Sequence, residues 1–178
     1  MTEESNGLVY GYRLGSGKLE NTLTWADVDA WRPENGLLWI HLDADHEAVL
    51  KWLTEKSGLS PLVTEALLEV GTRPRSVVHE SGVLAIFRGV NCNPGADPED
   101  MVAMRMFVTE QRVITMRRSR LMAVQDIHES LRAGSGPTTA GEFFVCVVDR
   151  ITERIGEIVA DIEDRVAEVE DTIVSVQS

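Results

Sequence analysis

Apolar and polar positions divide the chain into short runs of two kinds. Compact apolar runs between turn residues predict β-strands. These runs cover residues 8–14, 37–42, 76–80, 83–90, 101–108 and 112–117. Apolar positions three and four apart predict helices in the stretches 24–31, 43–58, 60–71 and 121–131. Together they predict an α/β fold in which helices flank a mixed β-sheet.

Polar residues mark where several of these helices are expected to begin. Thr24 can cap the first helix, because its side-chain oxygen can accept from a free amide of the first turn. Asp43 or Asp45 offers the same kind of cap to the second helix. Ser60 precedes Pro61, and proline is well tolerated at the first helical position, so the third helix should open there.

The last part of the chain carries its longest periodic pattern. Thr139 and Glu142 have the spacing of a capping box, and no proline follows up to Ser178. The apolar positions form a near-heptad series with one extra four-residue step: Phe144, Val148, Ile151, Ile155, Ile158, Ile162, Val166, Val169, Ile173 and Val176. A helix of this length spans about 58 Å, so its apolar stripe needs other helices as partners.

The chain therefore divides into an α/β domain over residues 1–137 and the start of a long stalk helix over 138–178. The helical pattern still runs at the last residue, with no glycine or basic turn to stop it. We expect the natural protein to continue past Ser178. The stalk holds ten acidic and three basic residues, which gives it a charge of −7 within a chain total of −12.

Composition argues against several classes of function. No apolar run approaches the roughly 18–20 residues of a membrane span, and the acidic start is not a secretory signal, so we expect a soluble, cytosolic fragment. The net charge of −12 disfavours nucleic acid and favours cations as partners. Cys92 and Cys146 lack CxxC spacing and are interpreted as small apolar residues of a reducing compartment. No nucleophile-elbow, phosphate-loop or zinc-protease motif is present, which argues against an enzyme.

Four metal-capable side chains lie close together in the sequence, at His41, Asp43, Asp45 and His46. Imidazole and carboxylate groups suit zinc, and His41 and Asp43 share one face of a strand because strand side chains repeat every two residues. The alternative is structural. His41 would pack inside the strand, and one of the aspartates would cap the following helix.

The acids of the stalk are a second set of candidates. Glu157, Asp161 and Glu168 lie off the apolar stripe and would concentrate cations if several such helices assembled in parallel. The alternative is an ordinary solvated helix surface. A small basic patch is expected to form salt bridges with stalk acids, within or between subunits, and it consists of Arg112, Arg117, Arg118 and Arg120.

Five motifs follow one another along the chain: WIHLD at 39–43, LSPLV at 59–63, TRPR at 72–75, FRGVN at 87–91 and VITMR at 113–117. In order and spacing they resemble the CorA family of divalent-cation channels and transporters, and the long acidic helix resembles the start of its stalk. TRPR, RGVN and the segment GPTTAGE at 136–142 are closer to the zinc-transporting branch than to the magnesium branch.

The resemblance implies a homopentamer in the cytoplasmic membrane of a bacterium, with this part on the cytoplasmic side and the stalk helices joining the subunits. Zinc or another divalent cation would be the transported or regulatory ion, and no other cofactor is implied. The membrane would be reached only through a further C-terminal segment, which would carry the family's Gly-Met-Asn motif.

One position departs from the magnesium branch. Its members carry an acidic pair after the PLV motif, where this chain has Glu65 and Ala66. Magnesium gating through that site is therefore not favoured, and Glu65 stays a candidate ligand. A different interpretation of the whole chain is a soluble, oligomeric sensor or interaction domain with a coiled-coil helix. Two apolar stretches of about 20 residues further along the gene would favour the transporter.

Overall fold

The strands and helices follow the predicted order in the computed structural model, which describes residues 6–15, 22–71, 73–79 and 81–176. The strands are β1 (Leu8–Leu14), β2 (Leu37–Asp43), β3 (Arg75–His79), β4 (Gly82–Gly89), β5 (Val102–Val108) and β6 (Arg112–Arg117). The helices are α1 (Trp25–Ala30), α2 (Glu47–Glu55), α3 (Pro61–Leu68), α4 (Met122–Arg132) and α5 (Ala140–Val176), with a short 3-10 helix η1 (Pro33–Asn35). Glu80, expected at the end of a strand, lies outside the described residues.

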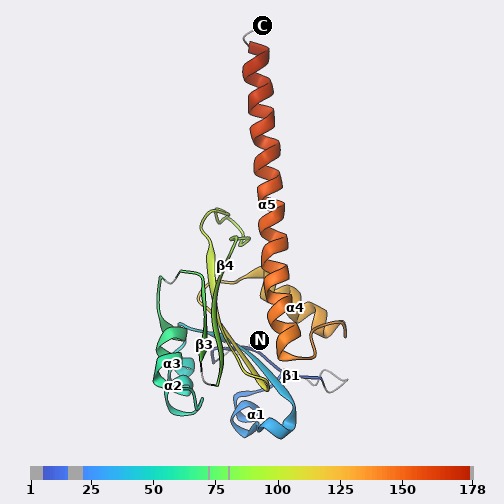
Figure 1. The fold of residues 1–178 in the computed structure, drawn as a ribbon. Helices are drawn as coiled ribbons and strands as arrows, with labels where there is room; N and C mark the ends of the chain where they lie inside the picture. Colours follow the sequence, from blue (N-terminus) through green and yellow to red (C-terminus); the bar gives the residue numbers. More distant parts are fainter. Residues whose placement is uncertain (1–5, 16–21, 72, 80, 177–178) are drawn as a thin grey trace.

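The strands form one mixed sheet in the order β1-β2-β6-β5-β4-β3. β2 and β6 pair in parallel, from Leu38 opposite Arg112 to Asp43 opposite Arg117, and the other neighbours are antiparallel. β3 with β4 and β5 with β6 form two antiparallel hairpins. The predicted fold class, a mixed sheet flanked by helices and followed by a long helix, is confirmed (Figure 1).

Helices cover both faces of the sheet, so the domain has two cores. Figure 1 shows α4 and the base of α5 on one face and α2 with α3 on the other. In β2, Leu38 and Ile40 contribute to the α2–α3 core, whereas Leu37 and Trp39 contribute to the α4–α5 core. β2 is buried from Leu37 to Leu42, which explains why it reads as a continuous apolar run rather than as an alternation.

Three helix starts carry the caps that the sequence predicts. Thr24 and Asp27 form a capping box on α1. The side chain of Ser60 caps α3 ahead of the proline at its first position. On α5, the Glu142 amide donates to Thr139 Oγ1 at 3.1 Å, and the Thr139 amide donates to the Glu142 carboxylate at 3.3 Å. These side chains satisfy amides that have no partner inside the helix.

The cap predicted for α2 was wrong. The N-cap is His46, whose Nδ1 accepts from the Ala48 amide, and neither Asp43 nor Asp45 takes this role. Asp43 is still paired with Arg117 in the β2–β6 ladder, and the turn that follows delays the helix until Glu47. Asp43 and Asp45 are both good capping residues, but the parallel β2–β6 ladder extends to Asp43, so α2 starts only after the turn that follows.

Helix α5 belongs to the domain at its start and leaves it further on. Phe143, Val147 and Ile151 are buried in the core that α5 shares with α4. From Asp161 to Ile173 every side chain is exposed. Figure 1 shows the helix projecting far beyond the sheet. A single long helix is therefore confirmed, and its apolar positions from Ile162 to Ile173 are exposed rather than packed on the domain.

Candidate functional site

His41 is buried in the core between the sheet and helices α4 and α5. Its Nδ1 lies 2.9 Å from Thr115 Oγ1, and the Thr115 hydroxyl donates to the Ile40 carbonyl at 3.2 Å. Nδ1 is therefore the donor of the His41–Thr115 pair. Burial, with the Arg117 charge as a second cause, lowers the pKa of His41 to about 3. A neutral, hydrogen-bonded ring agrees with the packed alternative for this residue.

The other three candidates of this stretch point to different neighbours. The Asp43 carboxylate accepts from the Asp45 amide at 3.2 Å, while the Asp45 carboxylate pairs with Arg118. His46 uses its Nδ1 to cap α2. Across residues 6–15, 22–71, 73–79 and 81–176, no group of three or more His, Cys, Asp or Glu side chains is placed to hold a metal ion. Within the described residues, the four candidates are neighbours in sequence but do not gather into such a group, so their metal binding stays a prediction.

Glu65 lies exposed on α3, where it lines a cavity of 680 Å³ with Glu69. Glu69 forms an ion pair with Arg75 at 2.7 Å. Ala66 is half-buried against the α2–α3 core. The magnesium branch of the family that the motifs resemble has an acid at the position of Ala66. In this domain such an acid would contact apolar side chains. Glu65 is therefore exposed beside one other carboxylate, Glu69, which is already paired with Arg75.

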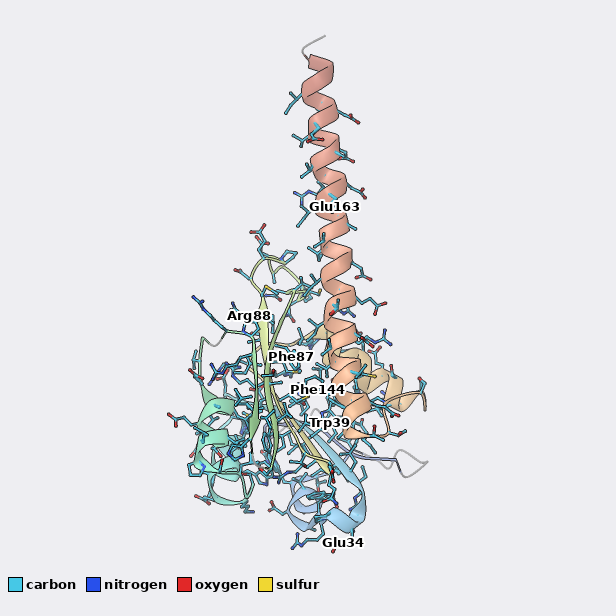
Figure 2. All side chains as sticks on the ribbon, viewed as in Figure 1. Glu34, Trp39, Phe87, Arg88, Phe144 and Glu163 are labelled. Carbon is cyan, nitrogen blue, oxygen red and sulfur yellow. The ribbon has the colours of Figure 1, made fainter. Side chains whose placement is uncertain are left out.

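The candidate acids of α5, Glu157, Asp161 and Glu168, are all exposed. Asp161 has Arg165 one turn away at 3.9 Å, an exposed pair of little energetic weight. Figure 2 shows side chains such as Glu163 projecting from the helix beyond the sheet. The helix arranges these acids along its length and does not gather them into a cluster.

Five large aliphatic residues form an unpartnered row along the outer part of α5, which we call the stalk stripe. About half of each side chain is exposed: Val159 47%, Ile162 46%, Val166 52%, Val169 58% and Ile173 53%. The row alternates steps of three and four, the spacing of a coiled-coil seam. The apolar series predicted from the sequence contains Ile158 in place of Val159, because both residues continue the three- and four-residue spacing.

Aromatic side chains fix the base of α5 to the sheet. The ring centroids of Trp39 and Phe143 lie 4.8 Å apart, and those of Phe87 and Phe144 lie 5.6 Å apart. Figure 2 shows Trp39, Phe87 and Phe144 together between the sheet and the helix. The direction in which the stalk leaves the domain is thus set by packing on β2 and β4.

An ion pair joins α4 to α5 close to where the stalk leaves the domain. Arg154 donates two hydrogen bonds from Nη2 to the Asp126 carboxylate, at 2.6 and 2.7 Å, and one from Nε at 3.0 Å. This pair was not predicted from the sequence, because no local pattern joins residues on different helices. Salt bridges between the basic patch and stalk acids of a neighbouring subunit stay a prediction. Within this chain, Arg112 donates to the Ser57 carbonyl, and Arg118 pairs with Asp45 and donates to the Leu68 carbonyl.

Residues 34–178 match the family model described as "CorA-like Mg2+ transporter protein". The chain belongs to the CorA family. The divalent cation transporter CmaX of Pseudomonas aeruginosa is 38% identical over 174 residues, which are 96% of this chain and 52% of that relative. The zinc transport protein ZntB of Pectobacterium carotovorum is 29% identical over 171 residues, 96% of this chain and 51% of the relative. The chain thus spans about half the length of these CorA-family relatives.

Solved structures share this CorA-family fold. Full-length CmaX superposes with a TM-score of 0.88 at 36% identity, covering 96% of this chain and 53% of that one. The ZntB cytoplasmic domain from Vibrio parahaemolyticus gives a TM-score of 0.80 at 21% identity, covering 91% and 64%. The resemblance predicted from the motifs, zinc transporters included, is confirmed. Within the described residues, no helix combines the length and apolar character that a bilayer crossing requires.

We expect zinc to bind this chain only weakly, in the micromolar range or above, because its metal-capable side chains are separated or already hydrogen-bonded. Isothermal titration calorimetry of the chain with zinc chloride measures this affinity. The double variant Asp43→Asn, His46→Gln should give nearly the same isotherm as the unmodified chain. Nanomolar binding of one ion per chain would contradict the prediction and would show a preformed site.

Proposed function

We propose that this chain forms the cytoplasmic part of a homopentameric transporter that carries divalent cations, zinc among them, across the cytoplasmic membrane of a bacterium. Membership of the CorA family supports transport, and relatives named as divalent-cation and zinc transporters support the class of ion. The transported cation is the cargo of the protein and needs no resident site in this domain.

The stalk stripe is the observation that carries the proposal. The aliphatic side chains over residues 159–173 are about half exposed to water. Covering them with another apolar surface would remove this area from water and stabilise the assembly that does so. The same helix is held at its base by the core, so its outer part is presented in a fixed direction. Parallel copies of α5 from neighbouring subunits can cover one another's stripes, and the number of five copies follows the family resemblance.

Assembly in parallel would also bring together the acids of the stalk. Each chain contributes a charge of −7 over residues 139–178, and helical periodicity puts Glu157, Asp161 and Glu168 on the side opposite the stripe. These carboxylates would stay in water and would face outward from the bundle. Their summed field would attract divalent cations and would weaken as salt shortens the Debye length.

The test of this proposal is zinc flux through the full-length protein in liposomes at two ionic strengths. Neutralising four stalk acids, as Glu157→Gln, Asp161→Asn, Glu168→Gln and Asp171→Asn, should slow flux about threefold or more at low salt, since fields of this kind raise association rates at least tenfold. The difference should disappear at high salt. The substituted side chains keep the shape and the helix compatibility of the originals.

A matched control neutralises four exposed acids of the domain: Glu34, Glu55, Glu99 and Glu110, each changed to Gln. The control should transport zinc at the unmodified rate at both salt concentrations. Equal flux for the stalk variant at low salt would contradict ion attraction by the stalk. Absence of any divalent-cation flux in the unmodified protein would overturn the transporter proposal and favour a sensor domain.

A further inference from the structure

Two adjoining cavities lie between α1, η1 and α2. Figure 1 shows α1 at the end of the domain away from the free end of α5. Their volumes are 280 and 530 Å³, and Asp29, Trp52 and Lys56 line both. We call them together the α1–α2 groove. Its larger part is in the size range of small-molecule sites. Neither the stalk stripe nor the stalk acids contribute to it.

The charge of the groove is opposite to that of the chain. Four cationic residues line it, and Asp29 is its one acid among the described lining residues: the cations are Arg32, Lys51, Lys56 and Arg112. The chain as a whole carries −12. The cavity beside α3 shows the contrast, since it is lined by Glu65 and Glu69 with no cation in the described part of its wall. Local positive charge in an acidic protein favours an anionic ligand at this place.

Arg112 is the half-buried cation of the groove, whereas Arg32, Lys51 and Lys56 are exposed. Its Nη1 donates to the Ser57 carbonyl at 2.7 Å, and no carboxylate within the described residues pairs with it. Burial lowers the pKa of its guanidinium, which shows that the charge has lost part of its hydration. A partly dehydrated guanidinium gains from an anion that offers two oxygen atoms, as a phosphate does.

Three of the four tryptophans of the chain line the groove, and their polar edges are already occupied. Trp25 Nε1 donates to the Asn6 carbonyl, Trp31 Nε1 to the Gly36 carbonyl and Trp52 Nε1 to Asp29. The rings of Trp25 and Trp52 lie 5.5 Å apart at 45°. Because these bonds fix the indole edges, the half-buried rings of Trp25 and Trp31 can offer apolar surface and π-faces to a ligand with little loss of side-chain entropy, while the buried Trp52 supports Trp25 from behind.

Asp29 organises the junction of the two cavities. Its carboxylate accepts from Trp52 Nε1 at 3.1 Å and from the Lys56 ammonium. One acid therefore fixes an aromatic wall and a cation side by side. Trp52 is buried, whereas Lys56 is exposed, so the ammonium stays open to a ligand entering from solvent.

We propose that the α1–α2 groove binds a nucleotide-class ligand, with its phosphate beside Arg112 and Lys56 and its planar ring against the tryptophan walls. The cationic residues supply charge-assisted hydrogen bonds, and the tryptophans supply stacking and apolar contact. This site is independent of the transport function proposed above. It would add binding of a small organic anion to the same domain.

The experiment titrates the purified chain with ADP in metal-free buffer and follows tryptophan fluorescence and binding heat. Inorganic phosphate and adenosine are titrated separately, because each carries one half of the recognised chemistry. We expect ADP to bind in the micromolar range and each half to bind at least about tenfold more weakly, the ratio expected for losing one strong interaction. If phosphate or adenosine bound as tightly as ADP, the proposed class of ligand would be wrong. The same conclusion would follow if ADP did not bind at concentrations up to millimolar.

Two variants and one control locate the site. Lys56→Gln and Arg112→Lys should each weaken ADP binding about tenfold, because Lys56→Gln removes a charge and Arg112→Lys removes the two-pronged geometry of a guanidinium. Arg165→Gln removes one positive charge from the exposed stalk and should leave ADP binding unchanged. Circular dichroism checks that each variant is folded. Unchanged affinity in folded Lys56→Gln, or equal weakening by Arg165→Gln, would overturn the site.

Discussion

Aspartate at Ile162 and Val169 should abolish self-association through α5 and leave the domain folded. Both positions belong to the stalk stripe and lie beyond the last contact of the helix with its own core. An unpaired carboxylate buried in an apolar helix interface costs several kcal/mol, and every subunit of the assembly would bring two of them. We expect the unmodified chain to associate at tens of micromolar, on the order of ordinary transient interfaces, and the double variant to be a monomer.

Sedimentation measures the mass of both proteins, and circular dichroism measures their helix content. Ala160→Asp with Ala167→Asp is the matched control, because it adds the same charge to exposed positions on another face of the same helix. The control should associate like the unmodified chain. An unmodified chain that stays monomeric, or a stripe variant that keeps its mass, would show that the stripe does not join subunits.

The strand and helix order was predictable because burial leaves a local trace in the sequence. β2 is buried on both faces, and its apolar run between Gly36 and Asp43 shows this directly. The capping pairs at Thr24 and Thr139 act within four residues, so they too can be read locally. The long helix follows from periodicity and from the absence of proline. All of these features depend on residues close together in the sequence, so they can be predicted without the tertiary structure.

The candidate metal site could not be settled in this way. Nearness in sequence from His41 to His46 suggested a shared ligand set, but β2 turns His41 into the core while Asp45 reaches Arg118. The start of α2 was misplaced for a related reason. The pairing of Asp43 with Arg117 across the parallel ladder is a contact between distant segments, and it competes with a local cap.

Features that join distant segments were the ones missed. The α1–α2 groove gathers Trp25, Trp52 and Arg112, which lie on three separate elements. The Arg154–Asp126 ion pair likewise joins two helices. A signal for the groove existed in the sequence, since all four tryptophans of the chain occur before residue 53, near several cationic residues. Only the packed structure shows that those side chains line one surface.

The base of α5 should be the most sensitive part of the helix to truncation of a side chain. Phe143 is fully buried and lies against Trp39, with ring centroids 4.8 Å apart. Phe143→Ala leaves a cavity next to a rigid sheet that cannot collapse into it. We expect a loss of about 3–5 kcal/mol in the free energy of unfolding, measured by urea denaturation followed by tryptophan fluorescence.

Val145→Ala provides the control on the same turn of the helix, since Val145 is 56% exposed and should change stability by less than about 0.5 kcal/mol. The comparison separates packing from helix propensity, because both substitutions introduce alanine into α5. A loss below about 1 kcal/mol for Phe143→Ala would mean that α5 is not anchored by this core. The stalk would then be free to change direction, and its base could not hold the stripes of neighbouring subunits in register.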